Sequence, residues 1–375
     1  MSMSADWREE LSKTIRSVDE LAQLGYVDKR KLPVLRKVAQ DYPVSVTRYY
    51  LSLIRKKDYS DPIYRMCIVS EGEQLPDGSK DTSGELSNTV TSGIQHKYEN
   101  TVLLLSTNRC AMYCRHCFRK RLVGQSEEEI LKIMDEAIEY VKNNPRVDNV
   151  LISGGDALLN SNKVIRLYLE GLTSIPHVKF IRFGSRTPVV LPQRISGDPE
   201  LVEILSHYGK LKKIYLVTQF NHTREFTEEA ITALNLMQKA GIPILNQTVL
   251  LKGVNDDAGE LTGLFHRFAE NGISPYYLFQ CRPVKGVKGH FCVPLLKGCE
   301  LVDQVRANLS GIAKRFRFAM SHVRGKIEIL GRLDGGRILF KQHQAKHRKD
   351  ANRIFSLRVS DGDLWLDEEL SRGIQ

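Results

Sequence analysis

The chain has 375 residues, of which 42% are hydrophobic and 26% are charged. This composition fits a folded protein of one large or two moderate domains, and it excludes a disordered, collagen-like or disulfide-stapled chain. The net charge of +11 favours an acidic substrate, an acidic protein or RNA as a partner. No run of residues approaches the roughly 18 apolar positions of a membrane span, and the first residues lack a secretory signal. We therefore expect a cytoplasmic protein with no membrane partner.

The N-terminal part of the sequence predicts helices. Apolar and charged positions alternate at helical spacing over residues 7–58, and the pattern ends at a break near residues 58–62. Residues 71–93 are rich in turn formers and poor in apolar side chains, so they predict an irregular connection.

From Thr101 onward, short apolar runs alternate with longer amphipathic segments. The runs predict strands at 101–107, 149–153, 180–184, 214–218, 244–251 and 275–280. The segments between them predict helices, the first three at 126–144, 161–174 and 198–208. Six such units predict an α/β fold, a partial TIM-type (β/α)6 barrel, with an open doubly wound sheet as the alternative.

The tail from about residue 316 has a different pattern. Short candidate strands at 316–320, 327–331, 337–341, 354–358 and 363–366 are separated by Gly-rich or charged turns. The sequence thus predicts three parts, which are a helical N-terminal region with its connection (1–95), the partial barrel (96–312) and a small β-rich C-terminal segment (313–375).

Three of the seven cysteines lie within eight residues, directly after the first predicted strand. Cys110, Cys114 and Cys117 have the spacing C-x3-C-x2-C. Three thiolates on one loop can hold three irons of a [4Fe–4S] cluster and leave the fourth iron open to a small molecule. Structural zinc is the alternative, but it normally takes four ligands in paired spacings, and the nearby His116 would have to point the same way as Cys117. The spacing and the position at a strand end favour the cluster.

The cysteines and four further stretches resemble radical S-adenosylmethionine enzymes of the lysine 2,3-aminomutase family. The matching stretches are CAMYCRHC (110–117), LISGGDALL (151–159), GSRTPVVLPQRI (184–195), NQTVLLKGVND (246–256) and SPYYLFQC (274–281). The resemblance covers residues 7 to about 328 and implies an isomerase that moves an amino group between adjacent carbons. In such enzymes the reduced cluster cleaves S-adenosylmethionine to a 5′-deoxyadenosyl radical, with the electron coming from a donor such as flavodoxin or ferredoxin.

The same resemblance implies which residues contact S-adenosylmethionine. Gly154, Gly155 and Asp156 would meet its methionine part, with Asp156 accepting a hydrogen bond from the ammonium group. The residues expected on the nucleoside side follow the third, fourth and fifth strands; they are Ser185, Arg186, Gln219 and Asn246.

Pyridoxal phosphate is also implied by the resemblance, held as a Schiff base by a lysine near the C-terminal end of the barrel. Lys326, in VRGKIEI, occupies the place of that catalytic lysine. Two family arginines that grip the phosphate correspond here to Lys97 and Thr101. Lys97 keeps a point charge, but the bidentate grip of arginine is lost. Of the implied cofactors, pyridoxal phosphate therefore has the fewest matching residues.

The expected substrate-binding residues differ from those of the lysine enzyme. Arg119 matches the family arginine that binds the α-carboxylate. The two aspartates that recognise the distant ammonium of lysine correspond to Arg282 and Ala319. Because a cation replaces an anion, the resemblance implies an acidic or neutral amino acid rather than lysine, with glutamate as the first candidate.

Two other functions stay open. A radical enzyme that modifies a protein or RNA without pyridoxal phosphate would fit the weakened phosphate site, the net charge and the basic segment 341–353, although that segment has no interleaved aromatics for stacking on bases. A non-enzymatic iron–sulfur module for electron transfer would leave the matching stretches unexplained. We expect a small amino acid rather than a nucleic acid as the partner, and a homo-oligomer by analogy with the family.

Overall fold

The computed structural model describes residues 6–125 and 128–366. The chain divides into two compact units. The first unit contains Met1–Glu71, Asn88–Phe220 and Arg224–Leu245, and the second contains Gly72–Ser87, Asn221–Thr223 and Asn246–Gln375.

The first unit begins with short helices, as the sequence predicts. They are α1 (Trp7–Ser12), α2 (Val18–Gln23), α3 (Leu32–Asp41), α4 (Arg48–Ser52) and α5 (Pro62–Cys67). The predicted end of the helical region near residues 58–62 is wrong, because α5 begins there. Asp61 caps the first turn of α5 by accepting from the backbone N–H groups of Ile63 and Tyr64, and Pro62 stands at a position where its missing N–H costs nothing.

Parallel strands form the centre of the first unit. They are β3 (Thr101–Thr107), β4 (Asn149–Gly154), β5 (Phe180–Gly184) and β6 (Lys213–Thr218), each paired in parallel with the next. All four strands predicted from the apolar runs are confirmed, within one residue at each end. Two short strands that the sequence analysis missed precede them, β1 (Thr89–Thr91) and β2 (Ile94–Tyr98), and β2 pairs antiparallel with β3.

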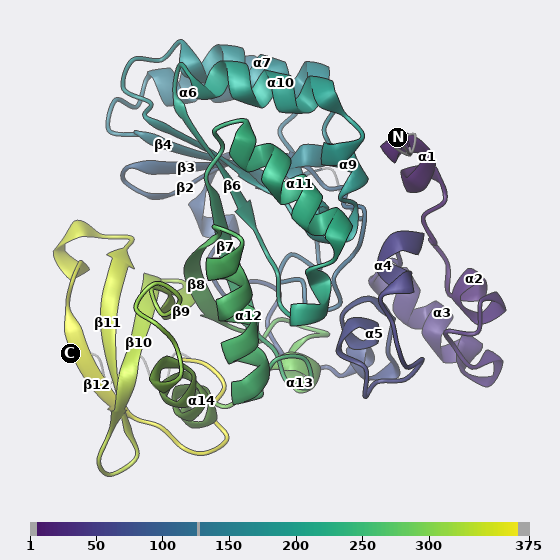
Figure 1. The fold of residues 1–375 in the computed structure, drawn as a ribbon. Helices are drawn as coiled ribbons and strands as arrows, with labels where there is room; N and C mark the ends of the chain where they lie inside the picture. The colour runs from purple at the N-terminus through teal and green to yellow at the C-terminus, as the bar shows by residue number, and fades with distance from the viewer. Residues whose placement is uncertain (1–5, 126–127, 367–375) are drawn as a thin grey trace. The chain divides into compact units, whose positions relative to one another are not determined.

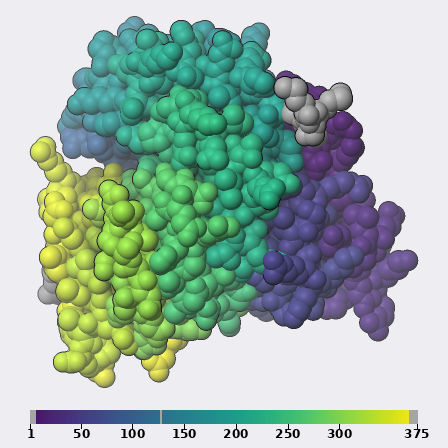
Figure 2. Space-filling model, in the orientation of Figure 1, coloured from purple at the N-terminus to yellow at the C-terminus, as the bar shows by residue number. Residues whose placement is uncertain are grey.

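Helices accompany these strands in the first unit. They are α6 (Met134–Lys142), α7 (Asn162–Thr173), α8 (Thr187–Val190), α9 (Gln193–Ser196), α10 (Pro199–Gly209) and α11 (Glu228–Lys239). Figure 1 shows α6, α7 and α10 lying together along the strands. In Figure 2 the same teal region is a surface of closely packed side chains. The helix predicted at 126–144 is shorter than expected. Residues 126 and 127 lie outside the described residues, and the helix begins only at Met134.

The second unit combines three further helices with the remaining strands. The helices are α12 (Ala258–Glu270), α13 (Lys288–Phe291) and α14 (Leu295–Ala307), and the strands are β7 (Ile244–Leu250), β8 (Ser274–Gln280), β9 (Arg317–His322), β10 (Gly325–Leu333), β11 (Arg337–Ala345) and β12 (Ile354–Arg358). Strand β9 pairs in parallel with β8, and β9 to β12 then pair antiparallel. The strand predicted at 363–366 is wrong. Trp365 and Leu366 are buried there as apolar side chains, without ladder pairing.

The described residues contain twelve strands whose order in the sheet is their order in the chain. The predicted α/β class is confirmed, while closure into a partial barrel stays a prediction because the pairing runs openly from β1 to β12. None of the described helices combines the length and the low polarity needed to cross a membrane.

Candidate functional site

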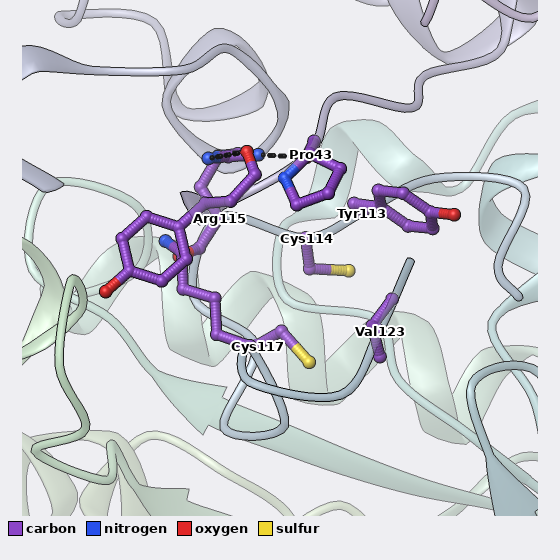
Figure 3. A pocket seen from close by; sticks show the side chains of 8 residues that line it. Pro43, Tyr113, Cys114, Arg115, Cys117 and Val123 are labelled. Atoms are coloured by element: carbon purple, nitrogen blue, oxygen red, sulfur yellow. Dashed lines mark hydrogen bonds between the residues drawn. The ribbon is translucent and has the colours of Figure 1, made fainter. Parts of the chain in front are cut away.

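The three clustered cysteines lie on the loop between β3 and α6 in the first unit. Cys110, Cys114 and Cys117 are each half-buried, whereas Cys67, Cys281, Cys292 and Cys299 are buried, as expected for small apolar side chains. Figure 3 shows Cys114 and Cys117 lining one pocket, together with Tyr113, Val123 and Pro43, which lies in the connection between α3 and α4. The three cysteines of this loop are thus less buried than the other four.

The connection between α3 and α4 holds this cysteine loop in place. The guanidinium group of Arg115 donates to the backbone carbonyl oxygens of Pro43 (2.9 Å) and Tyr42 (3.2 Å). The hydroxyl of Ser45 donates to the backbone carbonyl oxygen of Ala111 (3.1 Å). These bonds join segments about 70 residues apart in sequence. The conformation of the cysteine loop therefore depends on a region that the sequence analysis treated as separate.

The thiols are close enough to affect one another electrostatically. Burial raises the pKa of Cys110 well above its usual value, and Asp156, Cys117 and Cys114 raise it further. Burial and then Cys114 raise the pKa of Cys117 to about 11. Three thiolates together are unfavourable without positive charge, and a [4Fe–4S] cluster supplies that charge, so this donor set fits the cluster.

The described residues do not form a site for a single metal ion. Across residues 6–125 and 128–366, no three His, Cys, Asp or Glu side chains are arranged to hold one metal ion. A [4Fe–4S] cluster gives each thiolate an iron of its own, so its ligands do not need to converge on one point.

The turn after β4 passes directly over the start of the cysteine loop. The backbone N–H of Gly155 donates to Thr107 at 2.5 Å, and that of Asp156 donates to Arg109 at 2.8 Å. Gly154 has a φ of +112°, and a Cβ atom at Gly155 would lie 2.2 Å from the carbonyl oxygen of Arg109. Glycine is needed at both positions, because one has a left-handed backbone and the other approaches the loop too closely for a side chain.

Asp156 links this turn to the end of β5. Its carboxylate accepts from the hydroxyl of Ser185 (2.6 Å) and from the backbone N–H groups of Arg186 (2.7 Å) and Leu158 (3.1 Å). Burial raises its pKa in spite of these bonds. A carboxylate has about four acceptor positions, so one remains for a further donor after these three bonds. The predicted contact between Asp156 and an ammonium group is therefore compatible with the geometry.

Arg186 contacts three of the residues around the cysteine loop. Its guanidinium group donates to the Cys114 sulfur (2.8 Å), to the Gln219 carbonyl oxygen (2.9 Å) and to the Glu225 carboxylate. The Gln219 side chain in turn lies 3.4 Å from Nε2 of His116. The sequence analysis missed Glu225, and it considered His116 only as a zinc ligand.

Arg119 reaches the same turn from the cysteine loop. Its Nη1 donates to the Ser153 hydroxyl at 3.3 Å and lies 3.5 Å from the carbonyl oxygen of Gly154. The structure thus brings ten of the predicted residues into one connected region of the first unit. They are Cys110, Cys114, Cys117, Arg119, Gly154, Gly155, Asp156, Ser185, Arg186 and Gln219. Lys97 is elsewhere in this unit, on β2, with its Nζ 5.7 Å from the centre of the Tyr98 ring.

Lys326 lies at the start of β10 in the second unit and is half-buried. Its Nζ donates to the side chain of Gln344 (3.2 Å) and lies 5.1 Å from the centre of the Tyr277 ring. The hydroxyl of Tyr277 lies 3.0 Å from Nε2 of His343. Burial, and then Arg317, Lys326 and Lys341, lower the pKa of His343 to about 4. An amine beside an aromatic ring, with arginine and lysine charges nearby, is a donor set that fits a phosphorylated aromatic aldehyde.

The other predicted residues of the second unit lie on β7 and after β8. Asn246 is buried and donates to the hydroxyl of Thr248 (2.8 Å). Arg282 follows β8, and its guanidinium group donates to the hydroxyl of Ser83 at 2.8 Å. Ala319 lies on β9, opposite Phe279 and Glu328 on the neighbouring strands.

Comparison with known proteins supports the resemblance. The Radical SAM superfamily matches residues 104–264, which include the cysteine loop. A protein of Aquifex aeolicus (strain VF5), provisionally named L-lysine 2,3-aminomutase, is 38% identical over 360 residues, which are 96% of each chain. L-lysine 2,3-aminomutase of Clostridium subterminale is 40% identical over 309 residues, 82% of this chain and 73% of the relative. The chain belongs to the lysine 2,3-aminomutase family of radical S-adenosylmethionine enzymes.

This membership settles the class of the protein. It is a member of an enzyme family whose named relatives are isomerases, and the radical S-adenosylmethionine superfamily implies a [4Fe–4S] cluster and S-adenosylmethionine as cofactors. The family is not limited to lysine enzymes. Glutamate 2,3-aminomutase of Clostridioides difficile (strain 630) is 36% identical over 314 residues, 82% of this chain and 73% of the relative.

Proposed function

We propose that this enzyme is a radical S-adenosylmethionine, pyridoxal phosphate-dependent 2,3-aminomutase that acts on an acidic or neutral amino acid and not on lysine. Family membership supports the aminomutase reaction. The observation that carries the finer proposal is the cation at position 282, where the resemblance to the lysine enzyme would place an aspartate.

The residues around the cysteine loop are proposed to bind and orient the radical-forming cofactors. Cys110, Cys114 and Cys117 would hold the cluster, and the turn at Gly154 and Gly155 would let S-adenosylmethionine approach the backbone. The ten connected residues of the first unit support this assignment, since they bring the cysteine loop, the turn after β4 and the end of β5 together. When bound, the cluster and S-adenosylmethionine supply a radical that takes a hydrogen atom from the substrate.

Lys326 is proposed to hold pyridoxal phosphate. Its amine lies beside Tyr277, whose ring offers a stacking surface, and Arg317 and Lys341 add positive charge near His343. When bound, pyridoxal phosphate carries the migrating amino group. Lys97 would contribute a point charge to the phosphate, which is a weaker grip than an arginine provides.

Two arginines are proposed to select the substrate by charge. Arg119 would pair with the α-carboxylate, and the bidentate geometry of a guanidinium group suits that task. Arg282 would repel a distant ammonium group and attract a carboxylate, and Ala319 leaves no negative charge in the second position. A named relative acts on glutamate, which makes glutamate the first substrate to test.

The deciding experiment is the absorbance spectrum of anaerobically reconstituted protein after pyridoxal phosphate has been added and the excess removed. We expect a lysine-dependent pyridoxal band in the native protein and in Lys314→Ala, which removes an exposed lysine, but not in Lys326→Ala. Cleavage of S-adenosylmethionine should persist in all three. A native protein with a cluster but without this band would contradict the aminomutase proposal.

The second candidate function is the modification of a protein or RNA without pyridoxal phosphate. The replacement of the phosphate-gripping arginines by Lys97 and Thr101 favours it. The absence of the pyridoxal band, with intact cleavage of S-adenosylmethionine, would support this function. In either case a low-potential electron donor such as flavodoxin or ferredoxin, a homo-oligomer and a cytoplasmic location belong to the proposal.

A further inference from the structure

The guanidinium group of Arg186 joins three segments of the first unit. Its Nε donates to the carbonyl oxygen of Gln219 after β6 (2.9 Å), and its Nη1 donates to the sulfur of Cys114 (2.8 Å). Its third nitrogen, Nη2, donates to Oε1 of Glu225. Each nitrogen thus has its own partner, one on the cysteine loop and two on the connection between β6 and α11, and the group is held in one orientation against Cys114.

Glu225 is the anchor of this arrangement. Its side chain is 0% exposed, and the same oxygen that binds Arg186 accepts a 2.6 Å hydrogen bond from the hydroxyl of Tyr50 on α4. The Tyr50 ring also packs near the guanidinium group, with 5.7 Å between the ring centre and Cζ of Arg186. An arginine guanidinium group is not deprotonated in proteins. The group therefore carries a fixed positive charge.

We propose that Tyr50 and Glu225 position Arg186 on Cys114, and that this network sets the reduction potential of the [4Fe–4S] cluster. The inference rests on the cluster that the family implies and does not depend on the substrate or on pyridoxal phosphate. Reduction adds one electron from a low-potential donor to the cluster, and neither a bond nor a proton changes place. A hydrogen bond to a cluster thiolate and a nearby cation both stabilise the more negative reduced state.

The two charges of the network should act in opposite directions. The positive charge of Arg186 favours the reduced cluster. The buried negative charge of Glu225 disfavours it and partly cancels the electric field of Arg186 at the cluster. Both charges are buried, so salt and water screen them less than they screen surface charges. A purely structural network would instead change how much cluster the protein holds.

The test is a redox titration of the reconstituted cluster, followed by electron paramagnetic resonance in the absence of S-adenosylmethionine, with iron and sulfide content measured for each variant. Arg186→Gln should make the cluster harder to reduce, and Glu225→Gln should make it easier. We expect the ratio of reduced to oxidised cluster at a fixed potential to change about tenfold in each case, which corresponds to about 59 mV for one electron.

A matched control removes a charge close by in sequence. Glu229 is exposed in the first turn of α11, so Glu229→Gln should leave the potential nearly unchanged. Tyr50→Phe keeps the packing and removes only the hydroxyl, and it should lower the potential slightly, because the hydroxyl dipole no longer offsets the field of the Glu225 carboxylate.

Two results would overturn the inference. One is full cluster content with unchanged potentials in both charge variants, and the other is a shift of both potentials in the same direction. If Arg186→Gln holds no iron, the test of the network depends on the cluster potentials of Glu225→Gln and Glu229→Gln. Equal potentials in those two variants would then refute the role of the network.

Discussion

Ser185 donates a 2.6 Å hydrogen bond to Asp156 and thereby ties the end of β5 to the turn after β4. Both side chains are buried, and the backbone N–H of Arg186 donates to the other carboxylate oxygen of Asp156. The carboxylate is thus fixed at the ends of two neighbouring parallel strands, where α/β folds of this kind carry their chemistry. Its position depends on the close approach of the turn to the cysteine loop.

The first prediction tests that close approach. In Gly155→Ala the new Cβ atom would lie 2.2 Å from the carbonyl oxygen of Arg109, so the turn and the cysteine loop must move apart. We expect a loss of at least half of the bound iron after reconstitution, measured by iron and sulfide analysis. Gly311→Ala is the control, because nothing lies within 4 Å of the added methyl group. Native iron content in Gly155→Ala would show that the loop tolerates the displacement.

The second prediction concerns a buried ion pair that joins α9 to the start of α10. Arg194 is 0% exposed and donates to Asp198 at 2.7 Å, and the indole of Trp7 donates to the same carboxylate oxygen at 3.0 Å. Asp198→Ala leaves a buried guanidinium group without its anion, which costs about 3–5 kcal/mol of unfolding free energy. Urea unfolding measures the loss. Glu139→Ala removes an exposed partner of Lys142 and should cost less than about 1 kcal/mol; equal losses in the two variants would contradict the argument.

Much of the framework could be predicted from the sequence, because it depends on local patterns. Apolar runs such as 101–107 coincide with strands, and Gly154 and Gly155 were assigned to a turn at a strand end. The spacing of the three cysteines placed them on one loop for the same reason. Patterns formed by residues that are close together in the chain can be recognised in a single sequence.

The rest depends on contacts between distant segments. Glu225 binds Arg186 from 39 positions away, and Tyr50 binds Glu225 from 175 positions away, with no motif around either residue. The wrong strand at 363–366 has a related cause. Its apolar residues are buried by packing and not by pairing, and apolar character alone does not distinguish the two.

The third prediction concerns pH. His343 has a pKa of about 4 in the folded protein, below the usual 6.5, because of burial and of the charges of Arg317, Lys326 and Lys341. Between pH 6.5 and 4 the unfolded chain binds more protons than the folded protein at this residue, so stability falls as the pH is lowered through this window. The contribution is no more than about 2 kcal/mol, since the half-buried ring is partly screened by solvent.

Comparison with His343→Gln isolates this effect. The variant lacks the titrating group and should lose less stability than the native protein between pH 6.5 and 4, while differing little in slope above pH 7. Urea unfolding at intervals of pH measures both curves. Parallel curves through the whole window would show that His343 titrates normally.

The fourth prediction concerns the cluster itself. Cys114 accepts a hydrogen bond from Arg186 and shares the pocket of Figure 3 with Cys117, so its loss removes both a proposed cluster ligand and the contact of the charged network. We expect Cys114→Ala to lose most of its cluster absorbance and to abolish the cleavage of S-adenosylmethionine under strong reductant. Cys292→Ala is the matched control, because Cys292 is buried in the second unit and donates to the carbonyl oxygen of Cys281. It should keep the cluster and the cleavage at a modest cost in stability. Undiminished cleavage in Cys114→Ala would end the cluster assignment, since three irons cannot be held by the two remaining thiolates of the loop.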